Sequence, residues 1–233
     1  MNRKASVLLA FALLFVSASA GARGGIEAGY LNSNYNFKSD DRADYSLNGF
    51  YVGVTQDVKL FAGFHIQPGL YYSYLTDKDR KEVLAFSLNG DLTDHYLSLP
   101  IMLRYQFGLP FMKIYVFGGP TLSVGLVSKQ KYTVTGEFMG AMQNGNLTYD
   151  YYTGKLDLEA LDVPADGDNP YESMTPDYRY KRFDVQLGAG VGIELFKFLE
   201  VKVGYDWGLL DRFAGDFDEL RRNQFYASVG LRF

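Results

Sequence analysis

The sequence contains no cysteine, only two histidines and only seven prolines in 233 residues. Without cysteine, an exported chain has neither a disulfide framework nor a lipid-modified cysteine as an anchor. With His65 and His95 as the only imidazoles, little is available for the commonest acid–base and metal-binding side chain. Few prolines, 16% aromatic residues and 25 glycines favour a domain made of many strands and turns.

Long apolar runs are also lacking, except at the N-terminus. The basic stretch Asn2–Lys4 precedes an apolar run, Ala5–Val16, and "SASAGA" then offers small residues for cleavage after Ala20 or Ala22. This order is typical of a secretory signal peptide, which we predict at residues 1–22. A membrane anchor is the alternative, but the run is shorter than the roughly 20 residues that span hydrocarbon.

The rest of the chain, residues 23–233, has the size of one domain and lacks an excess of positive charge. Removing Arg3 and Lys4 from the 23 basic residues leaves 21, against 27 acidic residues, so the net charge is −6. Proteins that read nucleic acid carry basic patches, and none is evident here. We therefore expect no nucleic-acid partner.

Apolar and polar residues alternate along many segments of the sequence. The stretch "LEVKVGYDWGL" places apolar side chains at every second position, which indicates a β-strand. Seven further segments share this pattern, and together the eight are 25–32, 50–60, 64–75, 96–107, 113–126, 183–195, 199–209 and 224–233. Alternation alone leaves open whether the apolar faces pack inward, as in a soluble sandwich, or face lipid, as in an outer-membrane barrel.

The connections favour the barrel. Those near 61–63, 108–112 and 196–198 are short, and they alternate with long polar connections at 33–49, 76–94, 128–180 and 210–223. Outer-membrane barrels pair tight periplasmic turns with long extracellular loops in this way. We predict an all-β, eight-stranded antiparallel up-and-down transmembrane β-barrel. Its apolar face would contact lipid in the outer membrane of a Gram-negative bacterium.

The C-terminal strand ends on an aromatic residue. One face of this strand carries Phe225, Val229, Leu231 and Phe233. An outward-facing terminal aromatic resembles the assembly signal of outer-membrane barrels, which makes the barrel-assembly machinery an expected partner. The alternative is that Phe233 is simply the last apolar residue of the sheet.

Three segments together resemble the PorT-like outer-membrane β-barrel family. They are "YLSLPIMLRYQF" with Pro100, "IYVFGGPTLSVGL" with Gly119-Pro120, and "FDVQLGAGVGIEL" with Gly188-x-Gly190-x-Gly192. The resemblance spans residues 25–233 and implies an eight-stranded barrel of the Gram-negative outer membrane. It implies no activity for most members, although the namesake is linked to a protein-secretion system.

The polar faces of the predicted strands carry charges. An eight-stranded barrel is barely wide enough for its own side chains, so charges inside it must pair. We predict a salt-bridged plug; a narrow pore for ions or protons is the alternative. The small residues of "GAGVGIE" would relieve crowding there, and no helix follows them as a nucleotide loop requires. The expected interior charges are Glu27, Arg104, Asp184, Glu194, Glu200, Lys202, Asp206 and Arg232.

Catalytic and metal sites have little support. His95 is expected at the outer rim with Asp94 and Ser98 nearby, which leaves a membrane-embedded hydrolase as an alternative. The acidic segment 162–172 holds several oxygen ligands, but their spacing does not match a calcium loop and its Gly-Asp-Asn-Pro suits an ordinary turn. We predict no catalytic residue, no metal and no cofactor.

The longest connection, 128–180, is rich in tyrosine. We expect a hairpin within it, turning at Gln143–Asn146, because Asn-Gly favours tight turns. Tyrosines offer large contact area at low entropic cost, so a recognition surface is one interpretation and a lid over the barrel is the other. The candidates are Tyr149, Tyr151, Tyr152, Tyr171 and Tyr178. We predict a structural or surface-interaction protein whose partner is another envelope protein or an extracellular ligand.

Overall fold

The computed structural model describes residues 22–39, 43–83, 86–138, 141–161, 176, 178–215 and 218–233. All of its regular structure is β-strand, and none of the described residues forms a helix able to cross a membrane. The strands are β1 (Ala22–Phe37), β2 (Tyr45–Lys59), β3 (Phe64–Val83), β4 (Phe86–Leu109), β5 (Met112–Phe138), β6 (Ala141–Asp150), β7 (Lys155–Glu159), β8 (Phe183–Leu195), β9 (Leu199–Gly208) and β10 (Leu220–Arg232). The predicted signal peptide up to residue 21, the acidic segment 162–172 and Tyr171 lie outside the described residues.

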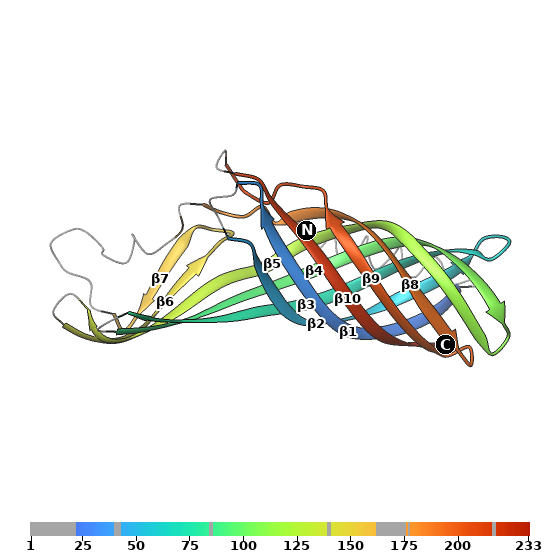
Figure 1. Cartoon of the computed structure of the whole chain (residues 1–233), viewed down its shortest axis with the longest axis horizontal. Coiled ribbons are helices and arrows are strands. Elements are labelled where there is room, and N and C mark those ends of the chain that lie inside the picture. The colour runs from blue at the N-terminus through green and yellow to red at the C-terminus, as the bar shows by residue number, and fades with distance from the viewer. Residues whose placement is uncertain are drawn as a thin grey trace, which may run out of the picture.

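Eight of these strands close into a ring (Figure 1). Going round it, the order is β1, β2, β3, β4, β5, β8, β9 and β10, and every neighbouring pair is antiparallel. The first and last strands meet along a register that runs from Gly25↔Arg232 to Phe37↔Leu220. Each of the eight predicted segments lies in one strand of the ring, apart from the last residue of three of them, so the predicted eight-stranded antiparallel barrel is confirmed.

The outer surface of the ring is apolar. In β9, Val201, Val203 and Trp207 are exposed, whereas Glu200, Lys202 and Asp206 between them are buried. A soluble sandwich would show the opposite arrangement, because its apolar face would form the core. The same outward set continues on the other strands, including Ile26, Phe50, Val52, Leu103, Val116, Leu187, Phe225, Val229 and Leu231. The apolar faces therefore meet lipid.

One end of the ring, the short-turn end, holds the tight connections and both ends of the folded chain. The turn between β8 and β9 places Phe196 and Lys197 at positive φ (53° and 67°), as a tight hairpin turn requires. Exposed apolar side chains surround this end, as in the interfacial girdles of membrane barrels. They are Leu60, Phe61, Phe107, Leu109, Phe111, Phe196, Phe198 and Phe233.

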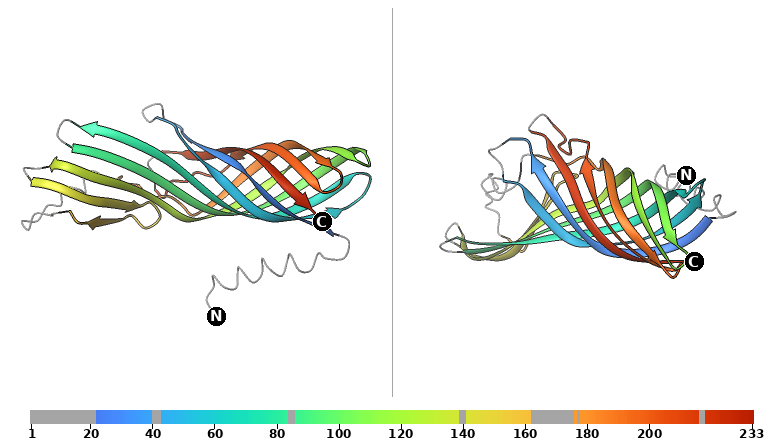
Figure 2. Two further views of the ribbon diagram at one scale, coloured as in Figure 1. Left: turned by 90° about the horizontal axis from the view of Figure 1, so that it is seen from below. Right: turned by 45° about the vertical axis from the view of Figure 1, so that its right-hand side comes forward.

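At the opposite, long-loop end, β3, β4 and β5 continue beyond the ring (Figures 1 and 2). Together with β6 and β7 they form the projecting sheet, which we define as residues 77–83, 86–94, 129–138 and 141–159. The predicted long connections are therefore partly strand, and the connection predicted at 76–94 is strand along most of its length. The expected hairpin turn at Gln143–Asn146 is wrong, because Phe138 pairs with Ala141 and Asn144 lies inside β6, paired with Thr135.

Candidate functional site

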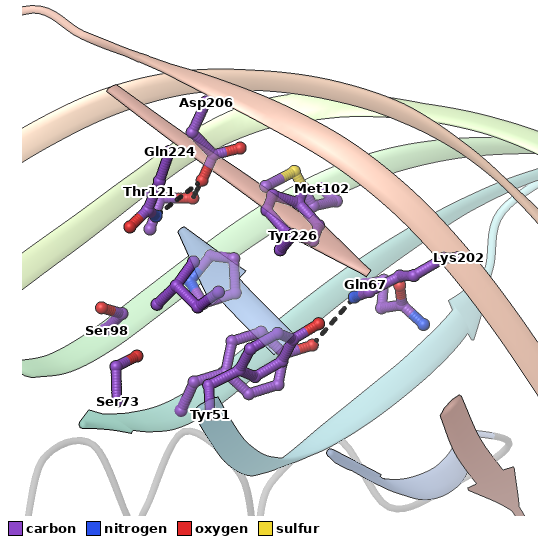
Figure 3. Close-up of a pocket in the computed structure, with 13 residues that line it drawn as sticks. Tyr51, Gln67, Ser73, Ser98, Met102, Thr121, Lys202, Asp206, Gln224 and Tyr226 are labelled. Atoms are coloured by element: carbon purple, nitrogen blue, oxygen red, sulfur yellow. Dashed lines mark hydrogen bonds between the residues drawn. The ribbon is translucent and has the colours of Figure 1, made fainter. Parts of the chain in front are cut away.

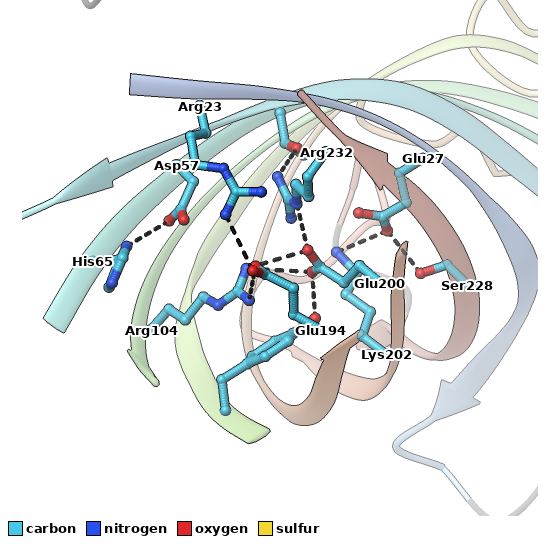
Figure 4. Close-up of polar contacts among 12 residues, drawn as sticks. Arg23, Glu27, Asp57, His65, Arg104, Glu194, Glu200, Lys202, Ser228 and Arg232 are labelled. Carbon is cyan, nitrogen blue, oxygen red and sulfur yellow. Dashed lines mark hydrogen bonds and ion pairs between the residues drawn. The ribbon is translucent and has the colours of Figure 1, made fainter. Parts of the chain in front are cut away.

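The interior at the short-turn end is built around Glu200 of β9 (Figure 4). Its carboxylate accepts hydrogen bonds from Arg104, with Nη1 to Oε2 at 3.3 Å, and from Arg232 and Tyr115. All four side chains are buried. The Arg104 guanidinium also lies flat against Tyr115, with Cζ 3.4 Å from the ring centroid. One acid thus bridges two arginines from opposite sides of the ring.

Glu194 of β8 extends this cluster to the rim. Its carboxylate lies 3.6 Å from Arg104 Nη2 and 3.1 Å from Arg23 Nη1. Gln106 donates from Nε2 to the second oxygen at 3.3 Å. At the same end His65 Nδ1 lies 3.1 Å from Asp57 Oδ1, so this histidine faces inward as expected from its strand position. Charged side chains therefore fill the short-turn end.

A second ion pair lies deeper in the barrel. Lys202 Nζ is 2.8 Å from Glu27 Oε1, and both side chains are buried. The same carboxylate accepts hydrogen bonds from Tyr51 at 2.6 Å, Ser228 at 2.8 Å and Tyr71 at 3.1 Å. This acid is therefore fully coordinated by groups on four other strands.

Above this pair the packing loosens around a small cavity (Figure 3). Its volume is about 40 Å³, and its lining includes Asp206, whose Oδ2 accepts from Gln224 at 3.2 Å and Thr121 at 3.4 Å. A buried water needs roughly 10–15 Å³ of such space, so a few waters fit. Met102 and Leu31 also line the cavity, so part of its wall is apolar.

Glycines make this narrow interior possible. A Cβ atom on Gly192 would lie 2.2 Å from Tyr115 Cζ, and one on Gly190 would lie 2.3 Å from Phe117 Cζ. Both rings are buried in the barrel. The small residues of β8 therefore leave the space that the large rings of β5 occupy, as expected from the sequence.

A third charged cluster lies toward the long-loop end. Arg222 Nε is 3.0 Å from Asp184 Oδ2, and the Arg222 guanidinium carbon is 3.9 Å from the centroid of the Tyr96 ring. Asp94 accepts hydrogen bonds from Tyr35 at 2.5 Å and Tyr96 at 2.9 Å. Asp94 and Arg222 were not among the expected interior charges. The sequence predicts loops at 76–94 and 210–223, although Arg222, Gln224 and Tyr226 continue the inward positions of β10.

Arg212 is a buried charge that the sequence pattern does not predict. It comes from the connection between β9 and β10, yet its side chain is fully buried and donates from Nη1 to Tyr96 Oη at 2.5 Å. Backbone hydrogen bonds hold this connection in the mouth: Lys181 donates to Arg212 O at 2.7 Å, and Arg212 donates to Leu220 O at 2.9 Å. No periodicity marks a connection, so no sequence signal points to this position.

Aromatic rings cover the third cluster at the mouth of the barrel. Tyr151 and Tyr180 stack with centroids 4.6 Å apart and an interplanar angle of 7°. Tyr178 packs edge-on against Phe213 at 4.9 Å. We call the whole group the aromatic lid: Tyr35, Tyr45, Tyr151, Tyr178, Tyr180 and Phe213. The lid and the charged clusters below it leave the interior closed at the long-loop end.

The lid corrects one expectation about the candidate recognition tyrosines. Tyr149 and Tyr151 are buried, so they do not stand on an exposed protein-binding surface. Tyr152 and Tyr178 are partly buried and pack against the same apolar cluster. The burial of these four tyrosines agrees with the interpretation of this connection as a lid. The fifth candidate, Tyr171, lies outside the described residues.

The rim residues of the hydrolase alternative do not come together. Asp94 and Ser98 point into the barrel, whereas His95 between them lies on the outer face. There His95 Nδ1 is 2.5 Å from Tyr72 Oη, and Ser98 Oγ instead bonds Ser123 Oγ at 2.9 Å. The expected grouping of these three side chains is therefore wrong. Among the described residues, no cluster of three or more acids or histidines is placed to hold a metal ion.

Comparison with known proteins gives one family match and several similar folds. The structure resembles the attachment invasion locus protein Ail of Yersinia pestis, with 11% identity, a TM-score of 0.46, and 91% of this chain and 99% of that one covered. It also resembles neisserial surface protein A, with 12% identity, a TM-score of 0.43, and 91% and 99% covered.

A major outer membrane protein of Thermus thermophilus is similar at 12% identity and a TM-score of 0.43, covering 91% of this chain and all (100%) of that one. A search of curated proteins finds no match. The family described as "Outer membrane protein beta-barrel domain" matches residues 17–214, most of the chain. The chain therefore belongs to the outer membrane protein beta-barrel domain family, whose members reside in the outer membrane of Gram-negative bacteria.

Proposed function

We propose that this barrel is a closed membrane anchor that presents the projecting sheet and the mouth to another molecule, with no chemistry of its own. The observation that carries the proposal is the filled interior. Charged side chains occupy the short-turn end, and the aromatic lid covers the long-loop end. Such a barrel is suited to structural or surface-interaction roles.

The filled interior argues against the pore alternative. Ions could pass only if Arg104, Glu200 and their partners separated, and each of these groups would then lose its counter-charge in a water-poor interior. Breaking one buried pair costs about 3–5 kcal/mol. At the other end the lid is fixed by backbone hydrogen bonds, among them Tyr180 to Tyr151 O at 2.8 Å.

Recordings in planar bilayers test this role. We expect no discrete conductance steps from the folded wild-type chain, whose insertion is checked by its heat-modifiable migration on gels. The double variant Arg104→Ser and Glu200→Ser removes the central pair without changing the net charge of the interior, and it should admit more ions. Stable single-channel steps from the wild-type chain would refute the closed-barrel proposal.

The absence of an enzymatic role is part of the same proposal. The separation of Asp94 and Ser98 from His95 supports it. Lipid and peptide substrates are incubated with the folded barrel and with His95→Ala. Hydrolysis by the wild-type barrel that disappears in the variant would contradict the proposal.

We further propose that the long-loop end is extracellular. The tight turns, the girdle of exposed aromatic side chains and the C-terminus all lie at the opposite end, as in barrels with periplasmic turns. A single cysteine replacing exposed Asp157 of β7 should react with an impermeant maleimide on intact cells. A cysteine replacing exposed Lys59, at the end of β2, is the matched control and should react only after lysis. The reverse pattern would invert the topology.

The C-terminal strand supports a proposed contact with the barrel-assembly machinery. Phe225, Val229, Leu231 and Phe233 are exposed on the outer surface of β10 and its end, where another protein can bind them before the ring closes. The finer resemblance to the PorT-like family adds the proposal of a role linked to secretion. Its support is limited to the order of Pro100, Gly119-Pro120 and the glycines of β8.

A further inference from the structure

A cleft of about 380 Å³ lies between the aromatic lid and the projecting sheet. Its volume falls in the range of about 300–1,000 Å³ that is usual for small-molecule sites. Among the described residues that line it, most are aromatic: Phe37, Tyr45, Tyr132, Tyr151, Tyr178 and Tyr180. The ring, the lid and the projecting sheet all contribute, so the cleft exists only because the sheet continues beyond the ring.

The wall of the cleft is held in place before any ligand binds. Tyr45 and Tyr180 share a hydrogen bond between their hydroxyl groups at 3.0 Å. Tyr45 also stacks on Tyr35 at 4.6 Å, and Tyr180 stacks on Tyr151 at the same distance. A wall of fixed rings loses little side-chain entropy when a ligand binds, which favours affinity.

The charges near the cleft argue against an ionic ligand. No lysine or arginine is among the described lining residues, so an anion would find no counter-charge. Behind the wall the guanidinium carbon of Arg212 lies 5.5 Å from the centroid of the Tyr180 ring, and Tyr151 covers that ring by stacking. A cationic ligand would be repelled by this fixed positive charge, and the one described carboxylate of the lining, Asp77, already takes part in another interaction. The cleft therefore suits an uncharged molecule.

The polar groups of the lining suit hydroxyl groups. Gln130 and Asp77 stand on β5 and β3 beside the tyrosine rings. Amide, carboxylate and phenol groups together donate to and accept from hydroxyls, while aromatic rings pack against apolar C–H faces. A sugar ring combines these two features, because C–H groups form its faces and hydroxyls its edge.

We propose that this cleft binds a neutral saccharide of about two sugar units. The inference rests on the proposed surface-interaction role and assigns a ligand class to it. The two remain separable: a conducting wild-type barrel contradicts the proposed role, whereas a closed barrel that binds no saccharide contradicts only the present inference.

The test uses the full-length folded barrel in a polyoxyethylene detergent, which carries neither sugar nor ammonium groups. Maltose, cellobiose, lactose and N,N′-diacetylchitobiose are the probes, and saturation-transfer NMR and calorimetry are the measurements. At least one disaccharide should bind, and Tyr132→Ala should weaken its binding tenfold or more. Gln130→Ala should weaken it as well. Tyr105→Ala, at the short-turn end, is the matched control and should bind like wild type.

Folding of each variant is verified by its heat-modifiable migration before binding is compared. Absence of binding for all four disaccharides at millimolar concentration would refute the inference. Binding of tetramethylammonium that is lost in Tyr132→Ala would also refute it, because the cleft would then be a cage for cations. Equal loss of disaccharide binding in Tyr105→Ala would show that the sugar is bound elsewhere.

Discussion

Replacing Glu200 with alanine tests how much the interior charges contribute to the stability of the barrel. The change removes the carboxylate that Arg104, Arg232 and Tyr115 share. Arg104 keeps Glu194 at 3.6 Å, but the interior then holds one more positive charge than before. Removing one partner of a buried pair costs about 3–5 kcal/mol, a large part of the roughly 5–15 kcal/mol of a typical domain.

The chain carries its own probe for this measurement. Trp207 is the only tryptophan, and it is 51% exposed on the outer surface of β9. Its emission should shift when the barrel leaves the bilayer, so urea unfolding in phospholipid vesicles can be followed by fluorescence. Glu200→Ala should lower the free energy of unfolding by about 3–5 kcal/mol, reduced only by whatever water enters the barrel.

Two controls separate charge from packing. Glu200→Gln keeps the volume and should still lose most of the stability, because the positive charge stays unbalanced. Glu219→Ala removes an acid that pairs with Lys38 and Arg221 on the surface, and it should leave the unfolding curve unchanged. A Glu200→Ala barrel as stable as wild type would refute the reasoning, since the arginines would then need no counter-charge.

Three further predictions follow from individual contacts. Phe233→Ala should lower outer-membrane levels in cell fractionation and leave unfolded chain in the periplasm, yet barely change the folded barrel, because this ring is 75% exposed; normal membrane levels would contradict an assembly role. Gly192→Ala should cost about 1–3 kcal/mol in urea unfolding by displacing Tyr115, whereas Gly118→Ala, with 3.2 Å to its nearest atom, should cost less. Burial raises the pKa of the Asp211 carboxyl. Hydrogen bonds from the Leu220 and Phe213 amides and from Lys181 outweigh that effect and lower this pKa below its usual value. The stability that this acid adds to the mouth is present above pH of about 4 and is lost as pH falls through its lowered pKa. The protection of those amides, measured relative to their intrinsic exchange rates at each pH, should therefore fall in acid for wild type but not for Asp211→Asn.

The membrane part of the fold could be predicted from the sequence because lipid imposes a pattern on it. Each crossing strand must show apolar side chains outward, so alternation marks both the strand and its inward positions. The eight charges expected inside, from Glu27 to Arg232, are all buried in the structure. Their individual partners were not predictable, since the pattern says which face a residue is on and nothing about its neighbours across the barrel.

Beyond the membrane the same pattern fades, and the predictions fail there. Strands such as the outer part of β3, "DKDRKEV", lie beyond the ring, where lipid does not require an apolar outward face, so their sequence resembles that of a loop. The turn at Asn144-Gly145 was predicted from local preference, but pairing along the whole of β5 and β6 outweighs that preference. The burial of Arg212 depends on contacts with Tyr96 and Lys181, which are distant in sequence.

The projecting sheet has a mechanical consequence. β5 contains 27 residues, which at about 3.3 Å per residue amount to roughly 90 Å of unbroken strand, while the apolar band of a membrane barrel is only about 25 Å tall. The strand that crosses the lipid is thus also the strand that reaches the tip. A load applied at the tip would pass down β5, through the register shift opposite His95 and Tyr96, and shear its pairing with β8. A pull on a molecule bound at the tip would therefore be borne by the strands of the barrel wall.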